Sequence, residues 1–303
     1  MDDVLAHTPN WETHIQVLRV FFERVRNANL SLRPSKCEIG YSKIDFLGQT
    51  IVEDSLVPNV KNLEKIIDAA RPATKSQLKS FLGLVGFYKS FISHYSDLTA
   101  PLTDLLKKVC PDKLRWGSPQ EAAFQNLKGC LTKEPVLKLP VIDREFTLRT
   151  DASGVAVAAV LLQLHDGRLH PVSFASKKLS PREARYPISE LETLGIVFGV
   201  QKYHSYLYAT HFVIETDHKP LEILTGGVSS NNRIMRWCLA LQAYNYTIRY
   251  IKGEDNLGAD FFSRHFNSPA ETFGAPVGVT LSRCPKSTSG KAGICKGEQG
   301  TSG

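Results

Sequence analysis

The chain has 303 residues, and roughly 150 residues per domain predicts about two domains. Apolar residues make up 42% and charged residues 22% of the chain, which is ordinary globular usage and excludes a wholly disordered chain, a collagen and a coiled-coil rod. The formal net charge of +7 is a mild excess that permits an anionic partner without requiring one.

Membrane, secretion and disulfide signals are lacking in this sequence. Uncharged apolar runs stay shorter than about 18 residues, and the N-terminus has no basic n-region. We therefore expect no transmembrane helix and no signal peptide, and a cytoplasmic or nuclear location. The six cysteines are scattered without a CxxC pair, which predicts free thiols in a reducing compartment. Cys284 and Cys295 lack His or Cys at ligand spacing, so we expect no zinc site there.

The N-terminal half is predominantly helical by its apolar spacing. A helix is predicted over residues 11–30, followed by a short strand over 44–51 with a turn at Gly48. A second helix begins near Thr74, which forms a capping-box pattern with Gln77. Its apolar residues recur at helical spacing: Leu78, Phe81, Leu82 and Val85. A third helix is predicted over residues 118–132.

From residue 144 the hydrophobic period changes to that of strands. Alternating residues lead into Asp151, and two further strands are predicted over 155–164 and 169–176, after a turn at Ser153–Gly154. The remaining elements are a long apolar helix, a strand running into Asp217, a helix, a strand and a short helix that holds Asp260, over residues 189–206, 211–216, 233–244, 247–251 and around 260. This mixed order predicts an α/β fold, a sheet with helices packed on its faces.

Four acidic residues stand at positions typical of a metal site: Asp151, Glu192, Asp217 and Asp260. Two follow strands and two lie on predicted helices, and strand ends commonly open into a crevice that holds a site. Converging carboxylates raise one another's pKa unless a cation joins them. Mg²⁺ prefers oxygen ligands, and two such ions can activate a water and stabilise the leaving oxygen of a phosphodiester.

Each of these acids also has an ordinary alternative. Asp151 and Asp217 suit turns that end strands, and Asp260 suits a solvated helix surface. Ser189 and Glu192 fit the capping-box pattern, so Glu192 can simply close a helix N-terminus. Glu190 competes with Glu192 as the helix acid, and periodicity does not choose between them, because apolar residues surround this helix on all sides.

Several segments together resemble the Pol polyproteins of gypsy-class long-terminal-repeat retrotransposons. The RNase H part of these polyproteins is resembled by TDASG (150–154), YPISELETLGIVFGV (186–200), TDHKPL (216–221) and NLGADFFSR (256–264). The reverse-transcriptase palm end, thumb and connection are resembled by residues 14–39, 45–51, 80–92, 98–106 and 122–137. The resemblance covers about residues 1 to 265, and its motifs occur in the family's order.

This resemblance implies an RNase H that cuts the RNA strand of an RNA–DNA hybrid with two Mg²⁺ ions, for which Mn²⁺ is the substitute. The implied catalytic residues and metal ligands are Asp151, Glu192, Asp217 and Asp260, and the family pattern selects Glu192 over Glu190. The implied fold is an RNase H-like mixed five-stranded sheet with flanking helices, preceded by a mostly helical thumb and connection.

The resemblance also divides the chain. Its divisions are a palm remnant, a thumb and connection, an RNase H-like domain and a Gly-rich tail that we expect to be disordered, over residues 1–57, 58–140, 141–265 and 266–303. Asp2 and Asp3 are similar to the end of the polymerase YxDD box. Because the third polymerase aspartate and the fingers lie upstream of this sequence, we expect no polymerase activity from this chain alone.

A duplex partner is expected to contact basic residues through its phosphates, in a salt-sensitive manner independent of sequence. The candidates are Lys75, Lys79 and Lys89 from the thumb and connection, with Lys107 and Lys108 beside them, and Lys219, Arg236 and Arg264 from the RNase H part. A solvated surface role is the alternative for each of the last three. Two rival functions stay open, a catalytically inactive nucleic-acid-binding remnant and a polymerase part that needs the palm and fingers from elsewhere.

Overall fold

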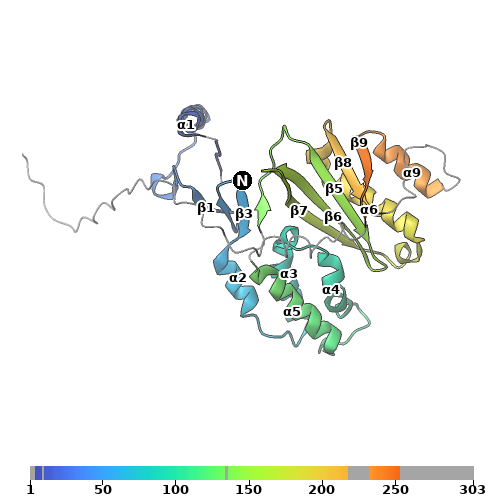
Figure 1. The fold of residues 1–303 in the computed structure, drawn as a ribbon. Helices are drawn as coiled ribbons and strands as arrows, with labels where there is room; N and C mark the ends of the chain where they lie inside the picture. Colours follow the sequence, from blue (N-terminus) through green and yellow to red (C-terminus); the bar gives the residue numbers. More distant parts are fainter. Residues whose placement is uncertain (1–3, 9, 134–135, 218–231, 253–303) are drawn as a thin grey trace, which may run out of the picture.

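A computed structural model describes residues 4–8, 10–133, 136–217 and 232–252 of the chain (Figure 1). The expected disordered tail over 266–303 and the expected helix around Asp260 lie outside the described residues. None of the described helices combines the length and apolar character that crossing a membrane requires. The four described cysteines, Cys37, Cys110, Cys130 and Cys238, are free thiols, as predicted.

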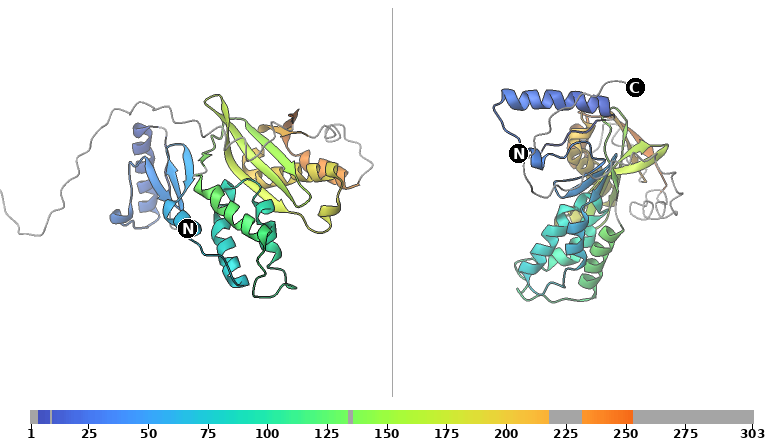
Figure 2. Two further views of the ribbon diagram at one scale, coloured as in Figure 1. Left: turned by 60° about the horizontal axis from the view of Figure 1, so that its bottom comes forward. Right: turned by 90° about the vertical axis from the view of Figure 1, so that its left-hand side faces the viewer.

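The N-terminal part consists of one helix and a small antiparallel sheet. Helix α1 (Trp11–Asn27) is followed by β1 (Lys43–Phe46), β2 (Gln49–Val52) and β3 (Ser55–Pro58), and a distant strand, β4 (Leu137–Lys138), completes the order β1-β2-β3-β4. Figure 2 shows α1 beside this sheet, at the end of the molecule remote from the larger sheet.

Two predictions in this part are wrong. The helix expected over 11–30 ends at Asn27, since Asn29 takes a φ of 54° that no α-helix continues. The single strand expected over 44–51 is a hairpin, β1–β2, because Leu47 and Gly48 adopt φ values of 48° and 75°. Two successive left-handed residues form the tight turn whose twist suits antiparallel strands, so the chain reverses where one strand was expected.

Four helices form a helical unit between β3 and β4. They are α2 (Val60–Ile67), α3 (Lys75–Phe87), α4 (Tyr95–Asp104) and α5 (Ser118–Thr132). The Thr74–Gln77 capping box and the helix over 118–132 are confirmed. The sequence did not predict α2, which has eight residues, or α4, which contains Pro101. Short 3₁₀ turns, η1 (Pro34–Lys36), η2 (Lys89–Phe91) and η3 (Glu183–Arg185), connect other elements.

The larger sheet has five strands in the order β7-β6-β5-β8-β9, which confirms the predicted mixed sheet. The strands are β5 (Phe146–Ala152), β6 (Ala156–His165), β7 (Arg168–Lys178), β8 (His211–Thr216) and β9 (Asn245–Tyr250). The β5–β6 and β6–β7 pairs are antiparallel, whereas β5–β8 and β8–β9 are parallel.

Three helices accompany this sheet, α6 (Ile188–Lys202), α7 (His204–Leu207) and α9 (Asn232–Leu241). The helix predicted over 189–206 is interrupted at Tyr203, which separates α6 from α7. The helix predicted over 233–244 ends at Leu241, and β9 starts at Asn245, earlier than expected.

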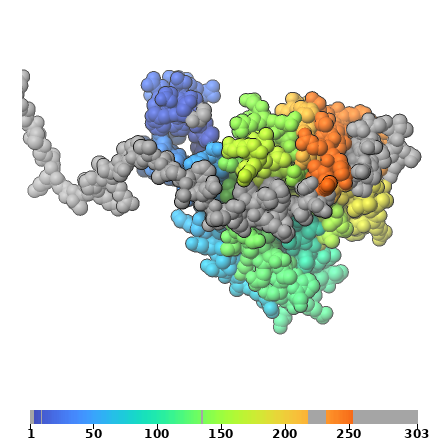
Figure 3. All heavy atoms as spheres, viewed as in Figure 1, coloured from blue at the N-terminus to red at the C-terminus, as the bar shows by residue number. Residues whose placement is uncertain are grey.

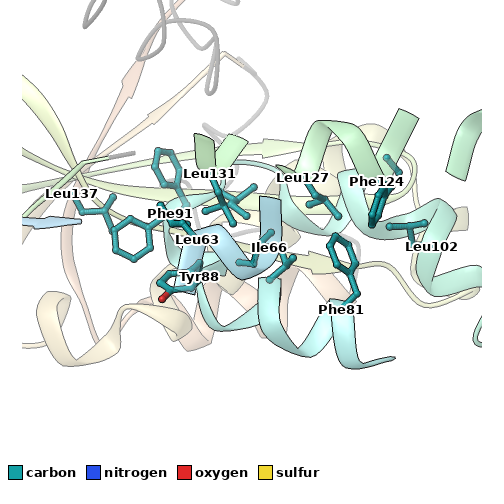
Figure 4. Close-up of a cluster of buried hydrophobic side chains, with 14 of the residues drawn as sticks. Leu63, Ile66, Phe81, Tyr88, Phe91, Leu102, Phe124, Leu127, Leu131 and Leu137 are labelled. Atoms are coloured by element: carbon teal, nitrogen blue, oxygen red, sulfur yellow. The ribbon is translucent and has the colours of Figure 1, made fainter. Parts of the chain in front are cut away.

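Strand β6 is buried on both faces. Ala159 and Leu161 belong to the core formed with α6 and α9, whereas Val160 and Leu162 belong to the core of the helical unit. A strand covered on both faces has a continuous apolar sequence, which explains the run over residues 155–164. Figure 4 shows the core of the helical unit, where Phe81, Tyr88, Phe124 and Leu127 are among the labelled side chains. In the space-filling view this helical unit lies directly below the larger sheet (Figure 3).

Candidate active site

The ends of two neighbouring strands bring Asp151 and Asp217 to one edge of the larger sheet. Asp151 is the penultimate residue of β5, and Asp217 directly follows β8. Strands β5 and β8 pair in parallel, with Leu148 opposite Ile214, so their carboxyl ends lie at the same edge. This is the edge at which open α/β sheets commonly hold ligands.

Glu192 reaches this edge from α6. The helix packs closely on the sheet, and a Cβ placed on Gly195, one turn after Glu192, would lie 3.7 Å from the backbone oxygen of Asp151. Only 6% of the surface of Glu192 is exposed. Its Oε2 is buried without a hydrogen-bond partner among the described residues. An acid in such a place lacks the donors that normally stabilise its charge.

The electrostatics show that the three acids act on one another. Burial, followed by the charges of Asp151 and Asp217, raises the pKa of Glu192 to about 8. Desolvation and neighbouring like charges both disfavour the ionised carboxylate. A carboxylate that shares its surroundings with two other carboxylates needs a proton or a cation.

Glu190 has a different environment from Glu192. It is also buried, but its carboxylate forms an ion pair with Arg233 of α9. The guanidinium of Arg233 lies over the ring of Tyr186, 3.8 Å from its centroid. Glu190 is therefore neutralised by a partner that also attaches α9 to α6.

The capping-box alternative for Glu192 is wrong. Helix α6 begins at Ile188 with Pro187 at the N-cap, and no side chain caps it. Ser189 lies inside the first turn, where its carbonyl oxygen accepts a hydrogen bond from the Thr193 hydroxyl. Asp151 lies within β5, and Ser153 makes the hydrogen bonds of the following turn. The position of Asp217, directly after β8, agrees with both of its alternatives.

His94 is a residue of this site that the sequence analysis missed. Its Nε2 lies 3.7 Å from Asp151 Oδ2, and its Nδ1 lies 3.8 Å from Asp97 Oδ2. Interaction with Asp97 and then the charge of Asp151 raise the pKa of His94, against the opposing effect of burial. His94 precedes α4, far from Asp151 in the sequence, so no local pattern connects the two residues.

The donor set fits a hard divalent cation in its chemistry. All three described acids offer carboxylate oxygens, as Mg²⁺ prefers, and the orphaned Glu192 oxygen needs a positive partner. Among the described residues, however, no group of three or more His, Cys, Asp or Glu side chains is arranged to hold a metal ion. Asp260, the fourth expected ligand, lies outside the described residues.

The predicted nucleic-acid contacts have varied surroundings. Lys75 donates hydrogen bonds from its ammonium to the carbonyl oxygens of Lys107 and Cys110, so it also ties α3 to a loop. Lys79, Lys89 and Arg236 are exposed. Lys75, Lys79 and Lys89 belong to the helical unit, whereas Arg236 belongs to α9, which packs with α6. Asp2, Asp3, Lys219 and Arg264 lie outside the described residues.

Comparison with known families identifies part of this architecture. Residues 141–244 match the family described as the RNase H-like domain found in reverse transcriptase. This match begins shortly before β5 and ends shortly before β9, so it includes Asp151, Glu192 and Asp217.

Curated relatives extend the similarity to most of the chain. The retrovirus-related Pol polyprotein from transposon 297 of Drosophila melanogaster is 34% identical over 267 residues, which cover 87% of this chain and 24% of that protein. The transposon Tf2-3 polyprotein of Schizosaccharomyces pombe is 36% identical over 269 residues, which cover 87% of this chain and 20% of that protein. The chain thus spans a quarter or less of the length of these relatives.

Solved structures show the same fold. The foamy viral protease-reverse transcriptase in complex with double-stranded DNA has a TM-score of 0.70 at 18% identity, covering 81% of this chain and 44% of that one. The same viral protein with an RNA/DNA hybrid has a TM-score of 0.69 at 17% identity, covering 93% of this chain and 37% of that one. The chain therefore belongs with the retrotransposon Pol polyproteins, in agreement with the gypsy-class resemblance, and carries an RNase H-like domain of the kind found in reverse transcriptases.

Proposed function

We propose that residues 141–265 form a ribonuclease H that hydrolyses the RNA strand of an RNA–DNA hybrid with two Mg²⁺ ions. The observation that carries this proposal is the environment of Glu192. It is a buried carboxylate with an unpartnered oxygen, and two further acids from the ends of adjacent parallel strands act on its charge. A fold stabilised only by its packing would gain nothing from such an arrangement.

The described residues would divide the work as follows. Asp151 and Asp217 would bind metal from the strand ends and Glu192 from the helix, with Asp260 as the fourth ligand. When bound, the Mg²⁺ ions would activate the attacking water and neutralise charge on the leaving oxygen. The 2′-hydroxyl groups and the A-like shape of the hybrid would distinguish the RNA strand from DNA.

The helical unit would hold the duplex next to this site. Two solved structures of the same fold contain double-stranded DNA and an RNA/DNA hybrid, which supports a nucleic-acid ligand. Residues 1–57 would be the palm remnant, 58–140 the thumb and connection, and 266–303 a tail outside the nuclease. Exposed Lys79 and Lys89 would contact phosphates, so binding should weaken as salt concentration rises.

A cleavage assay tests the nuclease proposal. The full chain is incubated with a hybrid labelled on its RNA strand, with Mg²⁺ or with EDTA. We expect Mg²⁺-dependent cleavage that Asp217→Asn and Asp151→Asn reduce by about a thousandfold or more, since each removes a charge that stabilises the transition state.

The matched control is Asp143→Asn, the same chemical change on an exposed residue before β5. This variant should cut as the wild type does. Equal background cleavage by the wild type and Asp217→Asn would overturn the nuclease proposal. Binding of the hybrid without cleavage would favour the inactive binding remnant instead.

A further inference from the structure

We propose that His94, which lies outside the family-matched domain, is a positioning residue that orients the carboxylate of Asp151 in the candidate RNase H site. The inference rests on the proposed function and extends it to the preceding helical unit. RNase H-like residues begin at 141 in the family match, whereas His94 immediately precedes α4. The site would therefore be completed by a segment that lies before the nuclease domain in the sequence.

The first argument is the direction of the His94 side chain. His94 takes a φ of 50° at the N-cap of α4, yet makes no capping hydrogen bond to that helix. Its two ring nitrogens instead face two carboxylates, Asp151 at 3.7 Å and Asp97 at 3.8 Å. Asp97 thus lies on one side of the ring and the proposed metal ligand on the other, an order typical of residues that orient metal ligands.

The second argument is that the same segment also fixes the turn next to Asp151. The hydroxyl of Ser153 donates a hydrogen bond of 2.6 Å to Asp97 Oδ1 and accepts one of 2.9 Å from the backbone N–H of Ala156. The backbone N–H of Ser153 donates to Ala156 O at 2.8 Å. Asp97 therefore holds both His94 and the β5–β6 turn, two residues after Asp151.

The third argument is that α4 is attached firmly to the larger sheet, so His94 has a fixed place. At its N-terminal end, the Ser96 backbone N–H donates to Ser176 Oγ of β7 at 2.8 Å. At its C-terminal end, Lys178 of β7 donates to Asp104 Oδ1 at 2.9 Å. Between these contacts Thr99 and Leu102 are buried. Functional groups work best when such rigid support holds them.

The test separates a role toward the metal site from a role in folding. His94→Asn and His94→Gly both keep a residue that tolerates the left-handed backbone, and neither side chain reaches Asp151. Binding of Mn²⁺ to the full chain is measured by electron paramagnetic resonance, and thermal unfolding is measured in EDTA. Hybrid cleavage is measured in parallel, with kcat and KM determined separately.

We expect both variants to bind Mn²⁺ about tenfold more weakly, the usual effect of losing an orienting partner. The value of kcat should fall while KM for the hybrid stays constant, and unfolding in EDTA should be unchanged. The control is His204→Asn, an exposed histidine on α7, which corrects for surface Mn²⁺ binding and should match the wild type.

Two results would overturn the inference in distinguishable ways. If the wild type cuts the hybrid and either His94 variant binds Mn²⁺ and cuts equally well, His94 has no positioning role and the nuclease proposal stands. If the wild type neither binds Mn²⁺ nor cuts the hybrid, the proposed function fails and this inference fails with it.

Discussion

Glu192 is an acid that the fold holds at a cost. Its pKa of about 8 means that, without a cation, the folded chain binds a proton there more tightly than the unfolded chain does. Below pH 4.5, the ordinary value, both states are protonated and Glu192 has no effect on stability. As the pH rises from there through about 8, the free energy of unfolding falls, because the folded state must carry the buried charge.

This argument predicts the effect of Glu192→Gln on stability. In EDTA above pH 8 the variant should be more stable than the wild type, by an amount on the order of a few kcal/mol. Near pH 4.5 the two proteins should unfold at the same temperature. Thermal unfolding followed by circular dichroism at both pH values measures this difference. A variant equally stabilised at both values would show that packing, not charge, is responsible.

The sequence located the two strand-end acids of the site by their strands alone. Asp151 and Asp217 end apolar strands, and the structure puts both at one sheet edge. The choice between Glu190 and Glu192 needed tertiary information, since it depends on Arg233, an ion-pair partner from another helix. His94 was missed for the same reason, because only the packing of α4 brings it to Asp151.

Helix α6 lies unusually close to the sheet because it presents glycine to it. A Cβ on Gly199 would stand 3.0 Å from the Cβ of Ala159 and 3.1 Å from a methyl group of Leu148. At Gly195 the nearest atoms would be 3.7 Å away, which is ordinary van der Waals contact. The close approach that brings Glu192 to the acids therefore depends on Gly199 rather than on both glycines.

A matched pair of substitutions tests this dependence. Gly199→Ala should destabilise the protein by about 1–3 kcal/mol, because a methyl group is forced into a filled core. Gly195→Ala should be neutral or stabilise by up to about 1 kcal/mol through its helix propensity. Urea denaturation of the two variants measures both effects. Equal destabilisation by both would mean that backbone freedom, and not space, selects glycine in α6.

Local signals determined how well each element was predicted. The Thr74–Gln77 capping box fixed the start of α3, because side chain and backbone satisfy each other there. Helix α4 escaped prediction since Pro101 normally ends a helix. The β1–β2 hairpin escaped because Leu47 adopts a left-handed backbone that its side chain does not favour. The break between α6 and α7 has no signal in an apolar run.

At the scale of the whole molecule, the larger sheet belongs to two cores. Val160, Leu162 and Phe174 pack with the helical unit, while α6 and α9 pack with Ala159 and Leu161. The sequence predicted both sets of elements, but it did not predict that one strand serves both, since an apolar run does not show which residues face which neighbour. Because of this sharing, the helical unit and the sheet should unfold together.

Phe174→Ala tests this coupling. The lost packing should lower the free energy of unfolding by about 3–5 kcal/mol. Hydrogen exchange measured by mass spectrometry should become faster in α5 as well as in β7, although the substitution lies only in β7. Leu164→Ala, at a residue of β6 that is 54% exposed, is the control and should change neither. Faster exchange confined to β7 would show that the two cores are independent.

The two-sided burial of β6 makes the chain far more sensitive to frameshift-free insertions and deletions than to point substitutions. Adding one residue within β6 would rotate every later side chain of the strand to the opposite face. Val160 would then face Gly199, where only the methyl group of Ala159 fits, and both cores would receive the wrong volumes at once. In a transposon copied by error-prone replication, codon gain or loss in this strand would thus disable nuclease and helical unit in a single event.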